Sequence, residues 1–274
     1  MSMHNLLADP FRGDVTRVSG TCALLAFDFD GTLAPIVASP DNAAMEESTR
    51  VRLTELAECR SVAIITGRSL ADIQPRLAGV RAAAIVGNHG IEPSPQMAGA
   101  RETVESWMPI LTNDLGDMAG VQIENKGHSL ALHYRHATSS ATARAAIDDS
   151  VRRLGPGVRR VEGIEVVNLV PVGAPHKGDA LQRLRRELRS AAVFYIGDEE
   201  TDEDAFATLD DGVSIAVRVG ITERSKARYF IPDQADIDAV LDLLLMSVRQ
   251  HDRRDVASDA PPDVQARPRA PAPP

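Results

Sequence analysis

The chain has 274 residues, of which 43% are hydrophobic, and its 39 acidic and 30 basic side chains give a net charge of −9. This length allows one large domain or two small ones, and an acidic chain is a poor non-specific binder of nucleic acid. No run approaches the roughly 20 apolar residues of a membrane span, and residues 1–20 lack the apolar segment of a signal peptide, so we expect a cytoplasmic protein without nucleic-acid or membrane partners.

Residues 1–20 show no regular pattern and are expected to form a loosely packed leader. The next stretch, Cys22 to Phe27, is an apolar run of the length of a buried strand, and Asp28-Phe29-Asp30-Gly31-Thr32 follows it. Side chains alternate across a strand, so Asp28 and Asp30 point the same way. An ordinary Asp-Gly turn is one interpretation. However, two carboxylates this close are costly without a cation or a shared proton, and this favours a magnesium ion and a nucleophile.

Helices and strands then alternate along the chain. The pattern predicts helices over 45–58 and 70–77 and strands over 61–65 and 82–86. Thr66 and Asn88 lie in the loops that follow these two strands. Such alternation predicts a parallel α/β sheet, in which the functional site lies at the carboxyl ends of the strands.

The pattern changes after residue 91. It predicts a helix, two strands, a second helix and two further strands, over 101–118, 121–124, 130–134, 138–154, 158–161 and 165–170. Such an order indicates an α+β module inserted into the parallel one, and we place this module at 92–172.

The parallel pattern then resumes with helices over 177–189, 202–209 and 237–248 and strands over 193–196, 213–217 and 228–231. The final segment, 249–274, is poor in large apolar residues and is expected to be a disordered tail. The predicted fold is therefore α/β. A Rossmann-like parallel-sheet core at 21–91 and 173–248 carries an inserted α+β cap.

Polar residues at the later strand and helix ends extend the candidate site. Asp198, like Asp28, ends an apolar strand; alone it is equally well an acidic helix start, but together the two favour a magnesium site. Thr66 offers a hydroxyl and backbone amides to a phosphate oxygen. Lys177 opens a helix, where a cation is disfavoured unless an anion lies nearby. An ordinary turn and a solvated lysine are the alternatives for these last two residues.

The order Asp-x-Asp, Thr, Lys, Gly-Asp-x-x-x-Asp resembles the four motifs of the haloacid dehalogenase-like phosphatases. The resemblance implies that Asp28 is the nucleophile, that Asp30 is the general acid/base, and that Thr66 and Lys177 bind phosphate. It also implies Mg²⁺ as the cofactor, with a metal site formed by Asp28, Asp30, Asp198 and Asp202.

Further stretches resemble the trehalose-6-phosphate phosphatases within that superfamily. They lie at 28–36 with Pro40, 66–68, 87–92, 124–126, 132–135, 177–178 and 197–206. The resemblance, which covers about residues 22–245, implies that trehalose 6-phosphate is hydrolysed through an aspartyl-phosphate. It also implies substrate contacts at Arg68, Asn88, His89, Glu124, Lys126, Arg135 and Asn168. A surface salt-bridge network is the alternative interpretation of the charged residues of the cap.

Two positions depart from the family pattern. Glu199 stands where the family usually has a second Asp beside the metal, and Asn168 stands where it usually has a Glu. The uncharged Asn168 leaves two other substrates open, glucosyl-3-phosphoglycerate and sucrose 6-phosphate. A non-catalytic sugar-phosphate sensor is the alternative of a different class. We expect a monomer whose partner is a small sugar phosphate.

Overall fold

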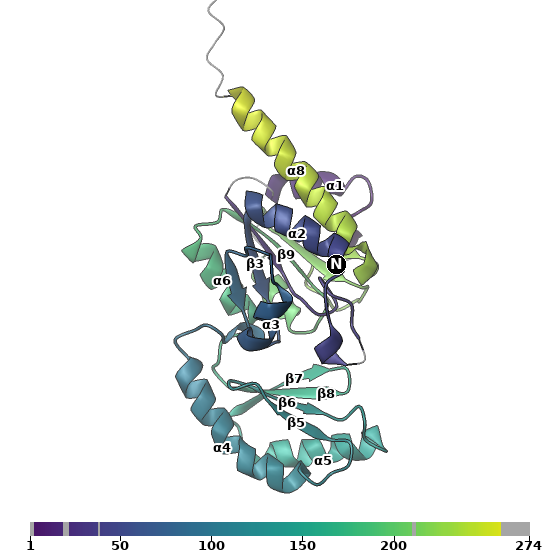
Figure 1. The fold of residues 1–274 in the computed structure, drawn as a ribbon, viewed down its shortest axis with the longest axis vertical. Coiled ribbons are helices and arrows are strands. Elements are labelled where there is room, and N and C mark those ends of the chain that lie inside the picture. The colour runs from purple at the N-terminus through teal and green to yellow at the C-terminus, as the bar shows by residue number, and fades with distance from the viewer. Residues whose placement is uncertain (1–2, 19–21, 38, 210–211, 259–274) are drawn as a thin grey trace, which may run out of the picture.

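The computed structural model describes residues 3–18, 22–37, 39–209 and 212–258. A seven-stranded sheet forms one layer (Figure 1), and its strands are parallel and lie in the order β1-β11-β10-β9-β2-β3-β4. They are β1 (His4–Asn5), β2 (Ala23–Phe27), β3 (Ser61–Ile65), β4 (Ala84–Val86), β9 (Ala192–Gly197), β10 (Ile215–Val219) and β11 (Tyr229–Ile231). β2 is an interior strand and pairs with β3 and β9. The predicted parallel sheet is confirmed.

Helices cover both faces of this sheet, and the side chains of β2 are accordingly buried on both sides. The helices are α1 (Arg12–Val18), α2 (Glu47–Cys59), α3 (Leu70–Arg76), α6 (Lys177–Glu187), α7 (Asp202–Phe206) and α8 (Ile237–Ser258). Leu25 and Phe27 pack with α1, α2 and α8, and Leu24 and Ala26 pack with α6 and α7. A strand buried on both faces reads as a continuous apolar run, and this is why its position could be predicted.

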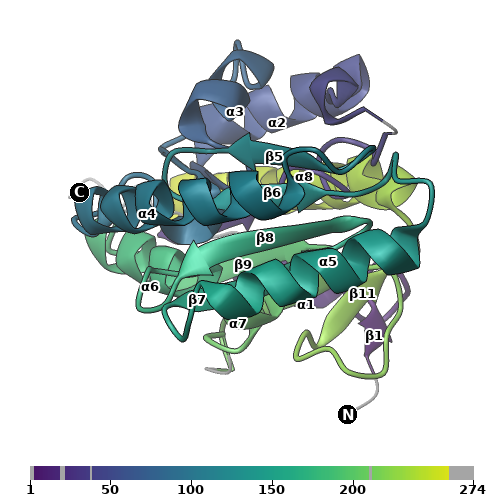
Figure 2. The same cartoon turned by 90° about the horizontal axis from the view of Figure 1, so that it is seen from below.

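A separate antiparallel sheet lies at the carboxyl ends of the parallel strands (Figure 1), with the order β5-β6-β8-β7. Its strands are β5 (Gln122–Asn125), β6 (Leu130–His133), β7 (Val158–Gly163) and β8 (Val166–Pro171). The helices α4 (Met97–Leu115) and α5 (Ser140–Arg153) cover its far face (Figure 2), where Leu132 and Leu169 pack against them. Residues of alternate position, such as His133 and Asn168, therefore face the parallel sheet.

Both terminal segments contain more regular structure than the sequence pattern predicts. The segment expected to be a loose leader forms β1, which pairs with β11, and α1, which packs on α8; Leu6 and Val15 are fully buried. In the segment expected to be a disordered tail, α8 continues through Ser258, and residues 259–274 lie outside the described residues. These interactions join the two ends of the chain, so local patterns do not reveal them.

None of the helices in the described part of the chain combines the length and apolar character that a membrane crossing requires.

Candidate active site

Three neighbouring strands bring polar groups to one edge of the parallel sheet. Asp28 follows β2, Thr66 follows β3 and Asp198 follows β9. The Asp28 amide donates to the carbonyl of Ile196 at 2.9 Å, and the Thr66 amide donates to that of Val86 at 2.9 Å. The sheet hydrogen bonding thus continues past the strands and holds these residues side by side at the carboxyl edge.

The ammonium group of Lys177 lies between two carboxylates. Its Nζ is 2.9 Å from Asp28 Oδ2 and donates to Asp202 Oδ1 at 2.8 Å. Lys177 is the first residue of α6, where the helix dipole disfavours a cation, so the two carboxylates must hold it there. Its side chain is 0% exposed, and the alternative of a solvated lysine is therefore wrong.

Burial and charge act in opposite directions on this pair. Burial lowers the pKa of Lys177, but Asp202 and Asp28 more than offset this, and the pKa lies well above its ordinary value. Burial also raises the pKa of Asp28, and the charge of Lys177 only partly opposes that rise. Asp28 therefore needs Lys177, and a further cation, to hold a full negative charge.

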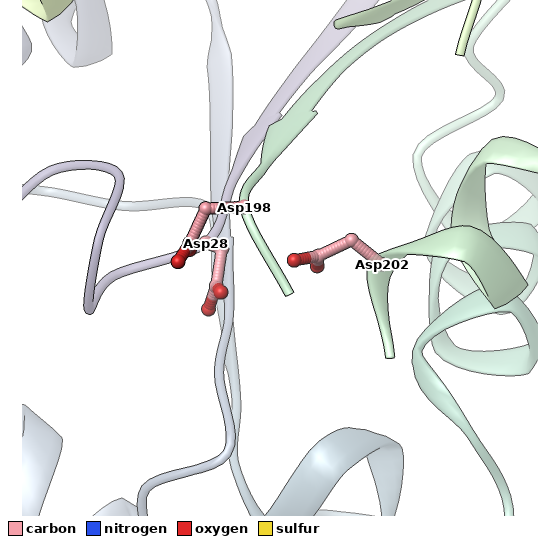
Figure 3. Close-up of side chains that lie close together, drawn as sticks. All are labelled: Asp28, Asp198 and Asp202. Atoms are coloured by element: carbon pink, nitrogen blue, oxygen red, sulfur yellow. The ribbon is translucent and has the colours of Figure 1, made fainter. Parts of the chain in front are cut away.

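Asp28, Asp198 and Asp202 form an acidic cluster (Figure 3). Each offers a carboxylate oxygen, and these atoms lie within 4.8 Å of one another. Burial, followed by the charge of Glu199, raises the pKa of Asp198 to about 8. Hard oxygen donors with uncompensated negative charge are the ligands that Mg²⁺ prefers, so the donor set fits this ion.

The three carboxylates of the cluster have different surroundings. Asp202 Oδ1 also accepts from the Tyr195 hydroxyl at 2.6 Å, and its Oδ2 accepts from the Glu199 amide at 2.9 Å. Asp198 lies against Gly31, where an added Cβ would be 2.1 Å from its Oδ2 and where φ is +72°. Because Asp202 is already held by several donors, Asp28 and Asp198 are better placed to bind a metal.

The carboxylate of Asp30 is not part of the cluster of Asp28, Asp198 and Asp202, and the place of Asp30 in a metal site stays a prediction. Both of its oxygens accept from the Arg68 guanidinium, each at 2.7 Å. Arg68 also donates to Asp72 at 2.5 Å and to the carbonyl of Pro40 at 2.8 Å. This bidentate pairing is the preferred geometry of arginine and carboxylate, and it occupies both oxygens of the Asp30 side chain.

A cleft runs from the acidic cluster to the antiparallel sheet. Its empty volume is about 1050 Å³, part of which is open to solvent. The predicted residues that line it from the parallel-sheet side are Asp28, Asp30, Thr66, Arg68, His89 and Asp198. Those that line it from the other side are Glu124, Lys126, Arg135 and Asn168. Most of the predicted site residues, although distant in sequence, thus share one cleft.

Two predicted substrate contacts, Asn88 and Lys177, are not among the residues that line this cleft. Lys177 lies behind Asp28, which does line it. Asn88 contacts a different part of the molecule. It is 0% exposed, and its side-chain amide bonds to the turn between β5 and β6. Its direct contact with substrate stays a prediction, and in this structure its side-chain polar atoms bond to Lys126 and Ser129.

The charged residues of the antiparallel sheet pair with one another on the cleft face. Glu124 Oε2 is 2.9 Å from His133 Nε2 and 4.0 Å from Lys126 Nζ. Arg135 Nε is 3.5 Å from Glu165 Oε2. The hydrogen bond from His133 lowers the pKa of Glu124. The salt-bridge network considered from the sequence does exist, but Glu124, Lys126 and Arg135 also line the cleft.

Sequence reasoning missed two residues at this site. His133 lines the cleft and Tyr195 holds Asp202. The period-two pattern of β6 could have assigned His133 to the cleft face once the pairing of β6 with β5 was known, but no local signal marks Tyr195.

His89 is a buried histidine whose ring has no hydrogen-bond partner in the described part of the chain. Its side chain lies in the cleft wall, and the residue is 4% exposed. Its backbone is left-handed, with φ of 57°, and its amide donates to the Thr66 carbonyl at 3.0 Å. Unpaired buried polar groups are rare and call for a partner. His89 is therefore well placed to hydrogen-bond a bound molecule.

The burial of His89 predicts a pH-dependent stability. Burial, followed by the charge of Lys177, lowers the pKa of His89 well below its ordinary value of 6.5. Below that pH the unfolded chain binds a proton that the folded chain does not, so stability falls as pH falls. Between about pH 7.5 and 5.5, we expect wild type to lose about 1.4 kcal/mol more unfolding free energy than His89→Asn.

Urea unfolding at the two pH values measures this difference, and Asn is chosen because it tolerates a left-handed backbone. His136→Asn, at an exposed position, is the matched control and should behave as wild type. Equal losses in wild type and His89→Asn would contradict the prediction.

Comparison with known proteins agrees with this geometry. A family model described as Trehalose-phosphatase matches residues 26–235, which include the acidic cluster and the whole antiparallel sheet. The chain belongs to the trehalose-phosphatase family. Trehalose-phosphate phosphatase of Mycobacterium ulcerans is 35% identical over 207 residues, which are 70% of this chain and 53% of that protein. Its counterpart in Mycobacterium avium is 34% identical over 226 residues, 75% of this chain and 57% of that protein.

The chain thus spans about half the length of these trehalose-phosphatase relatives. Among solved structures, the C-terminal domain of trehalose-6-phosphate phosphatase from Candida albicans matches with a TM-score of 0.72. The match covers 90% of this chain and 98% of that chain at 20% identity. At this identity the likeness concerns the fold, and it confirms the predicted combination of a parallel α/β core with a second sheet.

Proposed function

We propose that the chain is a phosphoric monoester hydrolase that converts trehalose 6-phosphate to trehalose and phosphate with Mg²⁺ as cofactor. Membership of the trehalose-phosphatase family supports this activity. The observation that carries the proposal is the cleft itself. One end is lined by Asp28, which pairs with the buried Lys177 behind it, and the other is lined by Glu124, Lys126 and Arg135. Such a cleft fits a ligand with a phosphate at one end and hydroxyl groups at the other.

Asp28 is the nucleophile in the proposed mechanism. Its carboxylate oxygen attacks phosphorus, the bond from phosphorus to the sugar oxygen breaks, and Asp30 gives its proton to the leaving alkoxide. Water then attacks the phosphorus of the aspartyl-phosphate, Asp30 takes a proton from it, and phosphate departs. Because Asp30 pairs with Arg68 in this structure, the scheme requires the Asp30 carboxyl to leave Arg68 when the sugar oxygen arrives.

The groups around Asp28 lower the cost of placing a phosphate there. Lys177 keeps its positive charge and orients the Asp28 carboxylate. Thr66 Oγ accepts from the Arg68 amide at 3.2 Å, so its own hydroxyl hydrogen is available to a phosphate oxygen. Asp28 and Asp198 would hold Mg²⁺, which supplies Lewis-acid neutralisation of phosphoryl charge when bound.

Residues on both sides of the cleft would recognise the sugar. Glu124, Lys126 and Arg135 offer charged hydrogen-bonding groups from the antiparallel sheet. His89 offers a neutral ring with one donor and one acceptor from the parallel-sheet side. Asn168, 8% exposed on β8, offers an amide where the family pattern has a carboxylate. For this reason glucosyl-3-phosphoglycerate and sucrose 6-phosphate remain alternative substrates. Monomeric state and cytoplasmic location stay predictions.

Phosphate release from a panel of sugar phosphates tests the proposal. The panel holds trehalose 6-phosphate, sucrose 6-phosphate, glucose 6-phosphate and glucosyl-3-phosphoglycerate, each with Mg²⁺ and with EDTA. We expect fastest release from trehalose 6-phosphate and none with EDTA. Preference for another member would support the phosphatase mechanism but would mean that Asn168 belongs to a pocket for a different sugar. Failure to release phosphate from any member would favour the sensor.

A further inference from the structure

The side chain of Asn88 fastens the cap to the parallel-sheet core. Its Nδ2 donates to the carbonyl of Lys126 at 3.1 Å, and its Oδ1 accepts from the Ser129 hydroxyl at 2.7 Å. A carbonyl oxygen can only accept, so the amide nitrogen must face Lys126 and the amide oxygen must face Ser129. Asn88 and Ser129 are both 0% exposed. The two hydrogen bonds are therefore shielded from competing water.

The backbone of Asn88 is held as firmly as its side chain. Its amide donates to the carbonyl of Arg68 at 2.8 Å, and its φ is +48°. Asparagine is among the few residues that adopt this left-handed region readily. Across the contact, the Lys126 amide donates to the Ser129 carbonyl at 3.0 Å and closes the turn. Asn88, which follows β4, is thus bonded through its backbone to the loop after β3 and through its side chain to the turn between β5 and β6.

A second contact fastens the same turn. His128 Nδ1 is 2.7 Å from Glu92 Oε1, and Glu92 Oε2 accepts from the Leu70 amide at 2.8 Å. Both Glu92 and His128 have side chains that are largely buried. The turn therefore contacts the core at two residues, Asn88 and Glu92.

The residue that Asn88 holds also faces the cleft. Lys126 lines the cleft, with Nζ 3.5 Å from the carbonyl of Gly67 and 4.0 Å from Glu124 Oε2. Gly67 follows Thr66, at the end of the cleft proposed for phosphate. The bond from Asn88 to the Lys126 carbonyl therefore sets how far Lys126 and the neighbouring Glu124 lie from the phosphate end.

We infer that Asn88 is a positioning residue for the sugar and does not touch the substrate. By fixing Lys126 and Glu124 relative to Thr66, it makes the cleft select phosphate esters that carry a large polyhydroxyl group over small ones. This inference rests on the proposed function and specifies how the same cleft recognises its substrate. A merely structural role would instead affect large and small esters equally.

Two substrates separate these roles. In the proposed function, trehalose 6-phosphate reaches from the phosphate end of the cleft to the cap, whereas p-nitrophenyl phosphate has no sugar to reach the cap. We choose Asn88→Gly because glycine keeps the left-handed backbone while both hydrogen bonds are lost. We expect its KM for trehalose 6-phosphate to rise roughly tenfold, which matches the loss of one or two hydrogen bonds. Its kcat/KM for p-nitrophenyl phosphate should stay within about twofold of wild type.

Two further variants each remove one of the two side-chain hydrogen bonds of Asn88. Ser129→Ala removes the donor to Oδ1, and Asn88→Asp keeps that acceptor but removes the donor to the Lys126 carbonyl. We expect Asn88→Asp to raise KM more than Ser129→Ala does, because only the former frees Lys126. Hydrogen exchange gives a readout independent of catalysis: backbone amides of residues 126–129 should exchange faster in Asn88→Gly than in wild type.

Several outcomes would overturn the inference. Equal loss on both substrates would mean that Asn88 serves overall stability, and unchanged KM for the sugar phosphate would mean that it positions nothing. If wild type prefers another panel sugar, the proposed substrate fails, but the ratio of that sugar to p-nitrophenyl phosphate tests Asn88 in the same way. If Asn88→Gly does not fold, Asn88→Asp and Ser129→Ala decide by the same ratio.

Discussion

Asp28→Asn is expected to fold and to lose phosphate release by at least roughly 10³-fold, because an amide cannot serve as the attacking oxygen. Folding should survive, since burial raises the pKa of Asp28 and a neutral side chain removes that cost. Lys177 keeps its hydrogen bond to Asp202 in the variant. Phosphate release and thermal unfolding, measured on the same preparations, test both parts of the prediction.

Asp117→Asn, at an exposed position between α4 and β5, is the matched control and should keep full activity. Turnover by Asp28→Asn within tenfold of wild type would mean that another residue receives the phosphoryl group. A non-catalytic sugar-phosphate sensor would be indicated if cells that carry the Asp28→Asn variant behaved as wild type although the variant released no phosphate.

Lys177→Met is expected to lose both activity and about 3–5 kcal/mol of unfolding free energy. Methionine has a similar shape but no charge, so Asp28 and Asp202 would remain buried without their shared cation. Urea unfolding measures the loss in stability. Lys226→Met removes an exposed lysine and should change stability by less than about 0.5 kcal/mol.

The pH dependence of this loss distinguishes charge from packing. Without Lys177, the pKa of Asp28 rises further above its ordinary value, because the opposing charge is gone. The folded variant then binds more protons than the unfolded chain, so its stability falls as pH rises above the ordinary range of a carboxyl. We expect a smaller deficit relative to wild type at acidic pH than at alkaline pH. A deficit that is small and independent of pH would contradict the role assigned to Lys177.

The sequence alone could locate the part of the candidate site that contains Asp28, Thr66 and Asp198, because the position of these residues depends on local patterns. The apolar runs of β2, β3 and β9 are continuous, and each is followed directly by a polar residue. Once these runs are taken as parallel strands, the carboxyl edge brings Asp28, Thr66 and Asp198 together without further information. Strand positions were therefore predicted to within a few residues.

The contacts on the antiparallel-sheet side of the cleft could not be predicted in this way, because they depend on pairing between distant segments. The contact of His133 with Glu124 requires the register of β5 on β6, and the role of Asn88 requires the cap to be docked on the core. The pairing of Asp30 with Arg68 likewise joins two loops. A family resemblance can indicate that such residues belong to a substrate site. Only their contacts in the structure show whether a residue faces the cleft or positions another residue that does.

Mapping the phosphoryl group during turnover tests the central claim most directly. Wild-type protein with Mg²⁺ is mixed with trehalose 6-phosphate whose phosphoryl oxygens carry ¹⁸O. The mixture is quenched in acid within milliseconds and digested for mass spectrometry. We predict that the label appears on Asp28 and is absent when Asp28→Asn is treated in the same way. Rapid phosphate release with the label on a different residue would contradict this account of the site.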